Sequence, residues 1–236
     1  MDTRVFALCS GSGGVGKSTF ALALACEAAS TGMQTILLDA NGVSRSCDLM
    51  LGMESVVTTD LVDVLSGQAG LQHALYSVPQ RDKLRLCCTS LLSNISLNEF
   101  AGVLLALRSM CDVLVIDLPT GDPALVTGLL GEEDMRVFLV RPDDSSLRAA
   151  ERMLMLTAHE QAKSAIVLCR VKREMTRKGF QYSEGTAAQI LDRPITGCIW
   201  EDDAMAARIG KRNAWFSFAG SARAQLDQVI KNLLKG

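Results

Sequence analysis

The 236-residue sequence has no apolar run close to the ~20 residues that a membrane-spanning helix needs. Its first four residues, MDTR, precede an apolar stretch of only five residues, which is too short for the core of a secretory signal. We therefore expect a cytoplasmic protein.

Proline and net charge are also scarce. The chain has 5 prolines and 48% hydrophobic residues, which excludes disordered and collagen-like classes. The 24 basic residues against 26 acidic ones give a net charge of −2, so no overall positive field favours nucleic acid or a membrane surface. Any such binding must be local.

Metal-ligand and disulfide motifs are missing as well. The two histidines, His73 and His159, stand apart from any cluster with metal-ligand spacing. The 8 cysteines include no C-x-x-C pair, and most lie inside apolar runs. We expect them to be reduced residues that pack as small hydrophobes.

What the sequence does contain is an alternation of short apolar runs with longer helical periods. This pattern predicts a single α/β domain over residues 1–236, with a doubly wound, mostly parallel sheet and helices on both faces. The expected strands are Val5–Ser10, Thr35–Asp39, Leu84–Cys88, Val113–Asp117, Arg136–Val140, Ala165–Cys169 and Ile195–Ile199. The expected helices are Lys17–Ser30, Thr59–Leu65, Leu97–Met110, Pro123–Leu130, Ser145–Gln161, Glu184–Leu191, Asp203–Ile209 and Ala222–Leu234. Ligands of such sheets bind beyond the carboxyl ends of the strands.

Residues 11–19, GSGGVGKST, follow the first expected strand and open the first expected helix. They fit the phosphate loop G-x-x-x-x-G-K-[ST], in which backbone N–H groups and the positive end of the helix bind phosphate oxygens. The alternative is a glycine-rich turn with a chance Lys-Ser. The phosphate-loop interpretation predicts nucleotide contacts from Gly11, Ser12, Gly13, Gly14, Val15, Gly16, Lys17, Ser18 and Thr19.

Three side chains of this region suit specific parts of a magnesium nucleotide. Lys17 supplies a charge to the β and γ phosphates, and the Ser18 hydroxyl fits the octahedral shell of Mg²⁺. Asp117 ends an apolar strand. This is the pattern of an acid that orients a magnesium-bound water. For Asp117 alone, a helix cap is the alternative; the phosphate loop in the same chain favours the metal role.

These residues resemble the MinD/ParA family of deviant Walker A ATPases, in the SIMIBI class of P-loop proteins, over nearly the whole chain. The matching segments are residues 10–19 SGSGGVGKST with S-G-K-G-G-V-G-K-[ST]-T, residues 37–41 LLDAN with L-I-D-A-D and its continuation at Arg45 and residues 48–52, residues 117–121 DLPTG with D-x-P-x-G, residues 142–148 PDDSSLR with P-E-x-x-S-[VL]-R, and residues 199–202 IWED with I-P-x-D.

The resemblance implies ATP and Mg²⁺ as cofactors and a homodimer. It places Lys17, Asp39 and Asn41 in the catalytic group, and Ser18, Asp39 and Asp117 at the metal. It also adds Arg170 and Trp200 to the nucleotide site. Trp200 either stacks on adenine or packs against the protein.

Three departures from the family pattern fall on its chemistry. Ser12 stands where the family has a lysine that reaches the partner's phosphates, Asn41 replaces the aspartate that positions the attacking water, and Cys169 replaces the asparagine that reads adenine. A cation supplied in trans is worth roughly 10³–10⁵ in rate in comparable NTPases. Asn41 cannot accept a proton, and a thiol is a weak hydrogen-bonding group. We expect weakened hydrolysis and reduced adenine selectivity, with phosphate binding retained.

Such erosion resembles the TadZ/CpaE branch, which places pilus or Tad secretion machinery. The resemblance thus implies a spatial or assembly regulator with partners in a pilus, secretion or division apparatus, cytoplasmic or held by those partners at the inner membrane or cell pole. The alternatives are an active MinD-type ATPase and a scaffold that no longer exchanges nucleotide.

Two weaker signals concern surfaces. Residues 170–178 hold five basic residues, but a solvated loop is favoured over DNA binding because no aromatic residue interleaves with them. The final expected helix has one apolar face, which we expect to pack on the sheet, and we expect no membrane-targeting tail.

Overall fold

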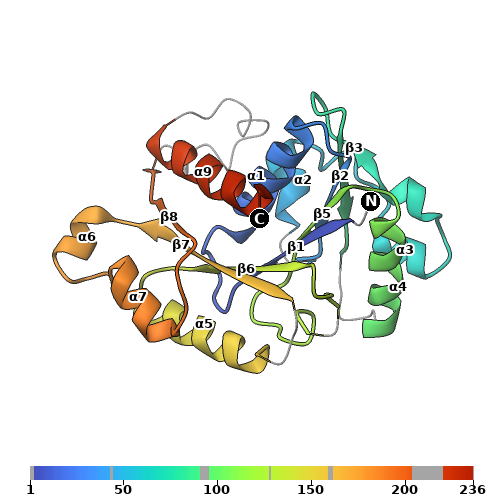
Figure 1. Cartoon of the computed structure of the whole chain (residues 1–236). Coiled ribbons are helices and arrows are strands. Elements are labelled where there is room, and N and C mark those ends of the chain that lie inside the picture. Colours follow the sequence, from blue (N-terminus) through green and yellow to red (C-terminus); the bar gives the residue numbers. More distant parts are fainter. Residues whose placement is uncertain are drawn as a thin grey trace.

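An eight-stranded sheet runs through the molecule in the order β3-β4-β2-β5-β1-β6-β7-β8 (Figure 1). The computed structural model describes residues 3–42, 45–90, 96–127, 129–158, 162–203 and 220–235. The strands are β1 Arg4–Cys9, β2 Thr35–Asp39, β3 Tyr76–Ser77, β4 Leu84–Cys88, β5 Val113–Asp117, β6 Met135–Val140, β7 Lys163–Val171 and β8 Gly197–Trp200. All neighbouring pairs are parallel except β3 with β4, which confirms the predicted fold class.

Helices cover both faces of this sheet. They are α1 Lys17–Ser30, α2 Ser46–Leu51, α3 Leu61–Leu65, α4 Leu97–Arg108, α5 Asp144–Leu156, α6 Arg173–Arg177, α7 Glu184–Leu191 and α9 Ser221–Lys235, with a 3₁₀ turn η1 at Leu71–Ala74. Among these residues, no helix is long and apolar enough to cross a membrane.

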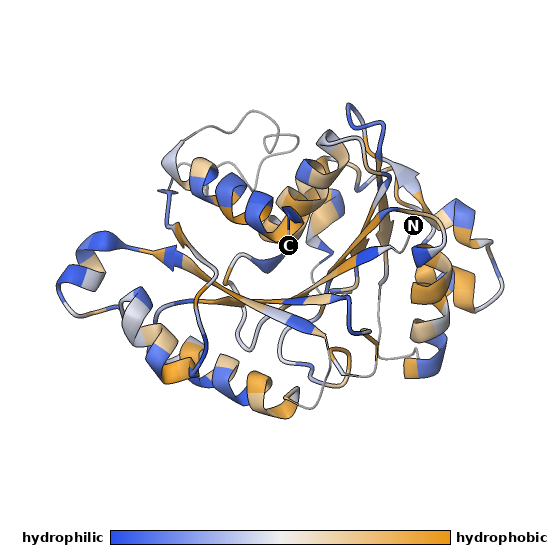
Figure 2. Ribbon diagram, viewed as in Figure 1, coloured by the Kyte–Doolittle hydropathy of each residue, from blue (hydrophilic) through white to orange (hydrophobic). Residues whose placement is uncertain are grey.

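Two apolar cores lie on opposite sides of the strands, because successive strand side chains point to opposite faces. Phe6 and Leu8 of β1 join α1, α2 and α9 in one core. The alternate residues of β1 join α3, α4, α5 and α7 in the other. Figure 2 shows the apolar colour along the central strands and hydrophilic residues gathered in α6. The final helix packs on the sheet side, as predicted, through Leu226 and Ile230.

Several expected elements differ from the structure. The helix predicted at Pro123–Leu130 is wrong: its described residues form turns, in which Pro123 O accepts from both Val126 N and Thr127 N. So short a helix is marginal without extensive packing, and the Asp122 side chain caps the turn instead. Of the helix predicted at Asp203–Ile209, only Asp203 lies among the described residues. His159 also lies outside the described residues.

Candidate nucleotide-binding site

The loop between β1 and α1 brings bare backbone to the carboxyl edge of the sheet. Gly16 has φ +98°, a left-handed conformation that L side chains rarely adopt. A Cβ on Gly11 would lie 2.5 Å from the backbone carbon of Ala149, so the loop also packs directly on α5. Helix α1 has no side-chain cap at its start. Its first N–H groups and positive end therefore suit an anion.

A buried ion pair lies beneath this loop. Lys17 Nζ is 2.5 Å from Asp117 Oδ1, and the two side chains are 5% and 0% exposed. Among the residues that the structure describes, Asp117 Oδ2 has no hydrogen-bond partner. A buried carboxylate oxygen of this kind fits a cation or its bound water, because a buried polar atom without a hydrogen-bond partner is costly.

Asp39 ends the neighbouring strand in register with Asp117. It accepts hydrogen bonds from Asn41 N at 3.1 Å and Cys47 N at 2.9 Å. Burial, with the negative charge of Asp117 as a smaller cause, raises the pKa of Asp39 to about 6. A cation beside both carboxylates would favour their charged forms.

These donors fit Mg²⁺. The ion prefers hydroxyl and carboxylate oxygens, which Ser18, Asp39 and Asp117 supply. Ser18 shares a cavity of about 240 Å³ with Lys17, Asn41 and Thr120. When bound, Mg²⁺ would neutralise phosphate charge and orient water, while Lys17 would hold phosphate oxygens.

Sequence reasoning missed Cys47 as a neighbour of the two carboxylates. Its sulfur and one oxygen of each of Asp39 and Asp117 lie within 4.8 Å of one another. Burial, more than the adjacent carboxylates, raises the thiol pKa well above its usual range, so the sulfur stays protonated near neutral pH. Helix α2, which carries Cys47, has only six residues, too few for a periodic signal.

The Ser12 side chain contacts helix α5 of the same chain. Its Oγ lies 2.9 Å from Ser146 Oγ, which also accepts from Arg141 N at 2.9 Å. The position that matches the family's signature lysine thus holds the loop to a neighbouring helix and carries no charge.

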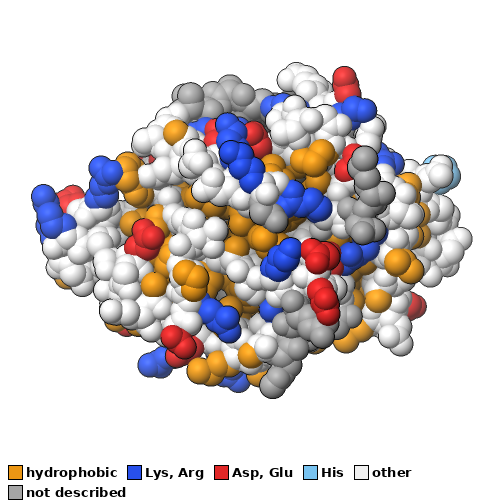
Figure 3. Space-filling model, viewed as in Figure 1, with side chains coloured by type: hydrophobic (Ala, Val, Ile, Leu, Met, Phe, Trp, Pro, Cys, Tyr) orange, Lys and Arg blue, Asp and Glu red, His pale blue; other side chains and the backbone are white. Residues whose placement is uncertain are grey.

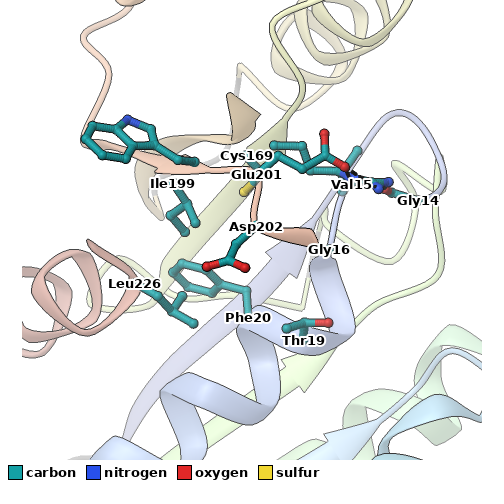
Figure 4. A pocket seen from close by; sticks show the side chains of 12 residues that line it. Gly14, Val15, Gly16, Thr19, Phe20, Cys169, Ile199, Glu201, Asp202 and Leu226 are labelled. Atoms are coloured by element: carbon teal, nitrogen blue, oxygen red, sulfur yellow. Dashed lines mark hydrogen bonds and ion pairs between the residues drawn. The ribbon is translucent and has the colours of Figure 1, made fainter. Parts of the chain in front are cut away.

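A second cavity of about 230 Å³ opens on the other side of the loop (Figure 4). It is lined by Gly14, Val15, Gly16, Thr19, Phe20, Cys169, Arg170, Ile199, Trp200, Glu201, Asp202 and Leu226. Cys169 and Arg170 come from the end of β7, and Glu201 and Asp202 follow β8. The two cavities share Gly14, Val15, Gly16 and Thr19, so they adjoin at the loop.

Arg170 connects the loop to the cavity wall. Its Nη1 donates to Gly14 O at 2.9 Å, and its Nη2 donates to Glu201 Oε1 at 2.8 Å. The guanidinium of Arg173 lies over the Trp200 ring, 3.2 Å from the ring centroid. That cation–π contact supports a packing role for Trp200.

A phosphate loop opening the first helix, paired carboxylates suited to Mg²⁺ and an adjoining base-sized cavity define a P-loop nucleotide-binding protein. The ParA family model, described as NUBPL iron-transfer P-loop NTPase, matches residues 2–169. Septum site-determining protein MinD of Helicobacter pylori is 31% identical over 209 residues, covering 84% of this chain and 78% of that protein. The chain belongs to the ParA family of P-loop NTPases, with MinD proteins among its homologues.

Solved structures share the fold. The MinC:MinD cell division protein complex of Aquifex aeolicus has a TM-score of 0.87 at 23% identity and covers 99% of this chain and 96% of its own. MinD of Pyrococcus horikoshii complexed with Mg-ADP has a TM-score of 0.82 at 22% identity and covers 99% and 98%. At these identities the likeness establishes the fold alone.

Proposed function

We propose that the protein binds Mg-ATP and acts, through its nucleotide state, as a regulator of position or assembly with weak hydrolysis. The observation that carries the proposal is the buried Lys17–Asp117 pair beside Asp39, directly under an uncapped helix start. The lysine and the N–H groups at the helix start suit the phosphates of a magnesium triphosphate, and the carboxylates suit its Mg²⁺. The Mg-ADP complex of the Pyrococcus protein supports it.

Thermal unfolding tests the binding step. A ligand that binds only the folded state stabilises it by RT ln(1 + [L]/Kd), so Mg-ATP at about 100 times Kd should raise Tm by roughly 5–10 °C. Lys17→Ala should abolish the rise. Lys163→Ala, at an exposed ion pair with Glu133, is the matched control and should keep it. An unshifted wild-type melt at millimolar Mg-ATP would refute the proposal in favour of a scaffold that no longer exchanges nucleotide.

The regulated machinery is inferred from the relatives. The septum-site name of the Helicobacter protein and the MinC:MinD complex support partners in division positioning. The changes at Ser12, Asn41 and Cys169 support the finer alternative of a pilus or secretion apparatus, with recruitment to the membrane or pole by those partners. The description of the family model also names iron transfer. The cysteine spacing of this chain gives no support for that role, because no C-x-x-C pair occurs.

DNA is the less favoured partner. In the basic segment 170–178, Arg170 pairs with Glu201, Lys178 pairs with Glu174, and Arg173 lies on Trp200. On the face drawn in Figure 3, basic and acidic side chains are interspersed. Phosphate backbones favour a continuous unpaired basic surface, which these contacts do not provide.

A nucleotide-dependent homodimer is part of the proposal. Because Ser12 is bonded to Ser146 and uncharged, we expect the dimer to be weaker or less dependent on ATP than a lysine-bridged one. Light scattering with ATP, ADP and no nucleotide measures this. Gly14→Val is the control, since Gly14 has φ +69°, a left-handed conformation that a β-branched side chain strains, in the loop proposed to hold phosphate. A monomer in all three conditions at high micromolar protein would leave a partner-binding monomer instead.

A further inference from the structure

Helix α6 lies at one edge of the molecule, past the ends of β7 and β8 (Figure 1). None of its five residues is buried, so it belongs to neither apolar core. It is nevertheless held in place. The Gln181 side chain accepts from Lys172 N at 2.7 Å and donates to Arg170 O at 3.2 Å, which fixes the base of the segment 172–180. We call this segment the α6 tip.

The α6 tip carries two exposed apolar side chains. Helix α6 ends in a Schellman motif, in which Gly179 has φ +78° and Phe180 N donates to Met175 O at 2.9 Å. In this motif the side chains at the positions of Met175 and Phe180 commonly pack together. These two residues remain 38% and 69% exposed. The motif therefore holds an aromatic side chain in solvent, which the stability of the fold does not require.

The α6 tip has a charge opposite to that of the whole chain. Its nine residues include four basic side chains and one acidic one, which gives a net charge of +3, whereas the chain carries −2. The acidic residue, Glu174, pairs with Lys178 at 2.6 Å, but the two side chains are 66% and 52% exposed. So exposed a pair contributes little and leaves the local positive field in place.

An anionic lipid surface fits this combination of groups. Interfacial segments place aromatic and aliphatic side chains at the boundary of the acyl chains and keep basic side chains at the headgroups. Each Lys or Arg near an anionic leaflet adds to the attraction. Nucleic acid would use the charges but would leave Met175 in solvent. A fluid bilayer interface adapts to a projecting apolar group, whereas a folded partner would need a pocket shaped for Phe180.

We infer that the α6 tip is a contact site for anionic lipid membranes, in which Phe180 and Met175 enter the interface while Arg177 and its basic neighbours contact the headgroups. The inference goes beyond the proposed nucleotide function and is independent of it, since no residue of 172–180 lines either cavity at the phosphate loop. With a net charge of only +3, the contact should be weak and sensitive to salt.

Sedimentation of the full chain with lipid vesicles tests the inference. We expect binding to phosphatidylglycerol vesicles at low salt, and binding at least about tenfold weaker to phosphatidylcholine vesicles. Phe180→Ser should weaken the first about tenfold by removing the inserted ring, and Arg177→Glu should do the same by reversing a charge. Leu105→Ser, at a residue of α4 that is 71% exposed, and Lys83→Glu, at another exposed basic residue, are the matched controls and should bind as the wild type does.

Several outcomes would overturn the inference. These are no binding to phosphatidylglycerol vesicles at low salt, equal binding to both lipids, and binding that Phe180→Ser leaves unchanged. Single-stranded DNA that binds as tightly as the vesicles, with loss in Arg177→Glu alone, would assign the tip to nucleic acid instead. The melting temperature and its rise with Mg-ATP show that each variant is folded and report nucleotide binding separately. Should Phe180→Ser fail to fold, Met175→Ser is the second apolar variant, with the same expected direction.

Discussion

The phosphate half and the base half of the site use charged groups in different ways. In the phosphate half, Lys17, Asp39 and Asp117 are buried, and each is 5% exposed or less. In the base half, the Arg170 side chain is 43% exposed and its partner Glu201 is 16% exposed. Buried groups are constrained by neighbours on several sides, whereas the base half is formed by strand ends that open to solvent.

The departures from the family pattern fall in both halves. Residues 13–19 and Asp117 keep the family pattern, whereas Ser12 and Asn41 depart from it in the phosphate half and Cys169 and Trp200 depart from it in the base half. In the proposed function, backbone N–H groups and one buried ion pair would hold the phosphates, and few residue types can substitute for these. Side chains at an opening would contact the base, where substitutions need not disturb the core.

Breaking the buried ion pair should have the largest effect. Lys17→Met leaves Asp117 as an unpaired buried charge and should lower the free energy of unfolding by about 3–5 kcal/mol without nucleotide. The double variant Lys17→Met with Asp117→Asn removes both charges and should recover most of that loss. Urea unfolding measures both. Equal stability of wild type and the single variant would mean that the pair does not contribute to the fold.

The pH dependence of stability should report Asp39. Its pKa of about 6 lies above its usual 3.8, so between pH 4 and 6 the folded state binds more protons there than the unfolded state. This residue alone therefore makes the free energy of unfolding fall as pH rises through that window, by an amount on the order of 2 kcal/mol.

Asp39→Asn should remove that slope when unfolding is followed by urea titration at pH 4.5, 5.5 and 7 in EDTA. Asp203→Asn is the control with an exposed carboxylate. Identical pH profiles for wild type and Asp39→Asn would contradict the raised pKa.

The elements with a strong apolar pattern and a boundary signal could be predicted from the sequence. Strands Thr35–Asp39 and Val113–Asp117 and helix Lys17–Ser30 have the predicted bounds, because each combines an apolar pattern with a clear boundary signal. The residues at their ends, Lys17, Asp39 and Asp117, are accordingly brought together as the topology requires.

Short elements and contacts between distant segments could not be predicted. Strand β3 has two residues and helix α6 has five, which is too few for a period of either kind. The contact of Ser12 with Ser146 joins residues 134 positions apart, and Gly11 lies against Ala149 of the same helix. Neither contact leaves a local pattern, since both depend on how α5 returns to the sheet edge.

The smallest expected effect concerns turnover. Wild-type phosphate release should be below ~1 s⁻¹, the lower end of ordinary enzyme rates, because Ser12 supplies no cation and Asn41 no base. Ser12→Lys with Asn41→Asp should raise it at least tenfold if the dimer forms. Single reversions should do little, because the two groups act as a unit.

Geometry sets the size of that gain. Ser12→Lys removes the hydrogen bond between Ser12 Oγ and Ser146 Oγ, which costs about 1 kcal/mol of stability. Ser12→Ala isolates this cost, and Ser30→Lys, at the end of α1, controls for added charge. Wild-type turnover well above ~1 s⁻¹ without any partner would show that the phosphate half is fully active as it stands, and that the departures at Ser12 and Asn41 are silent.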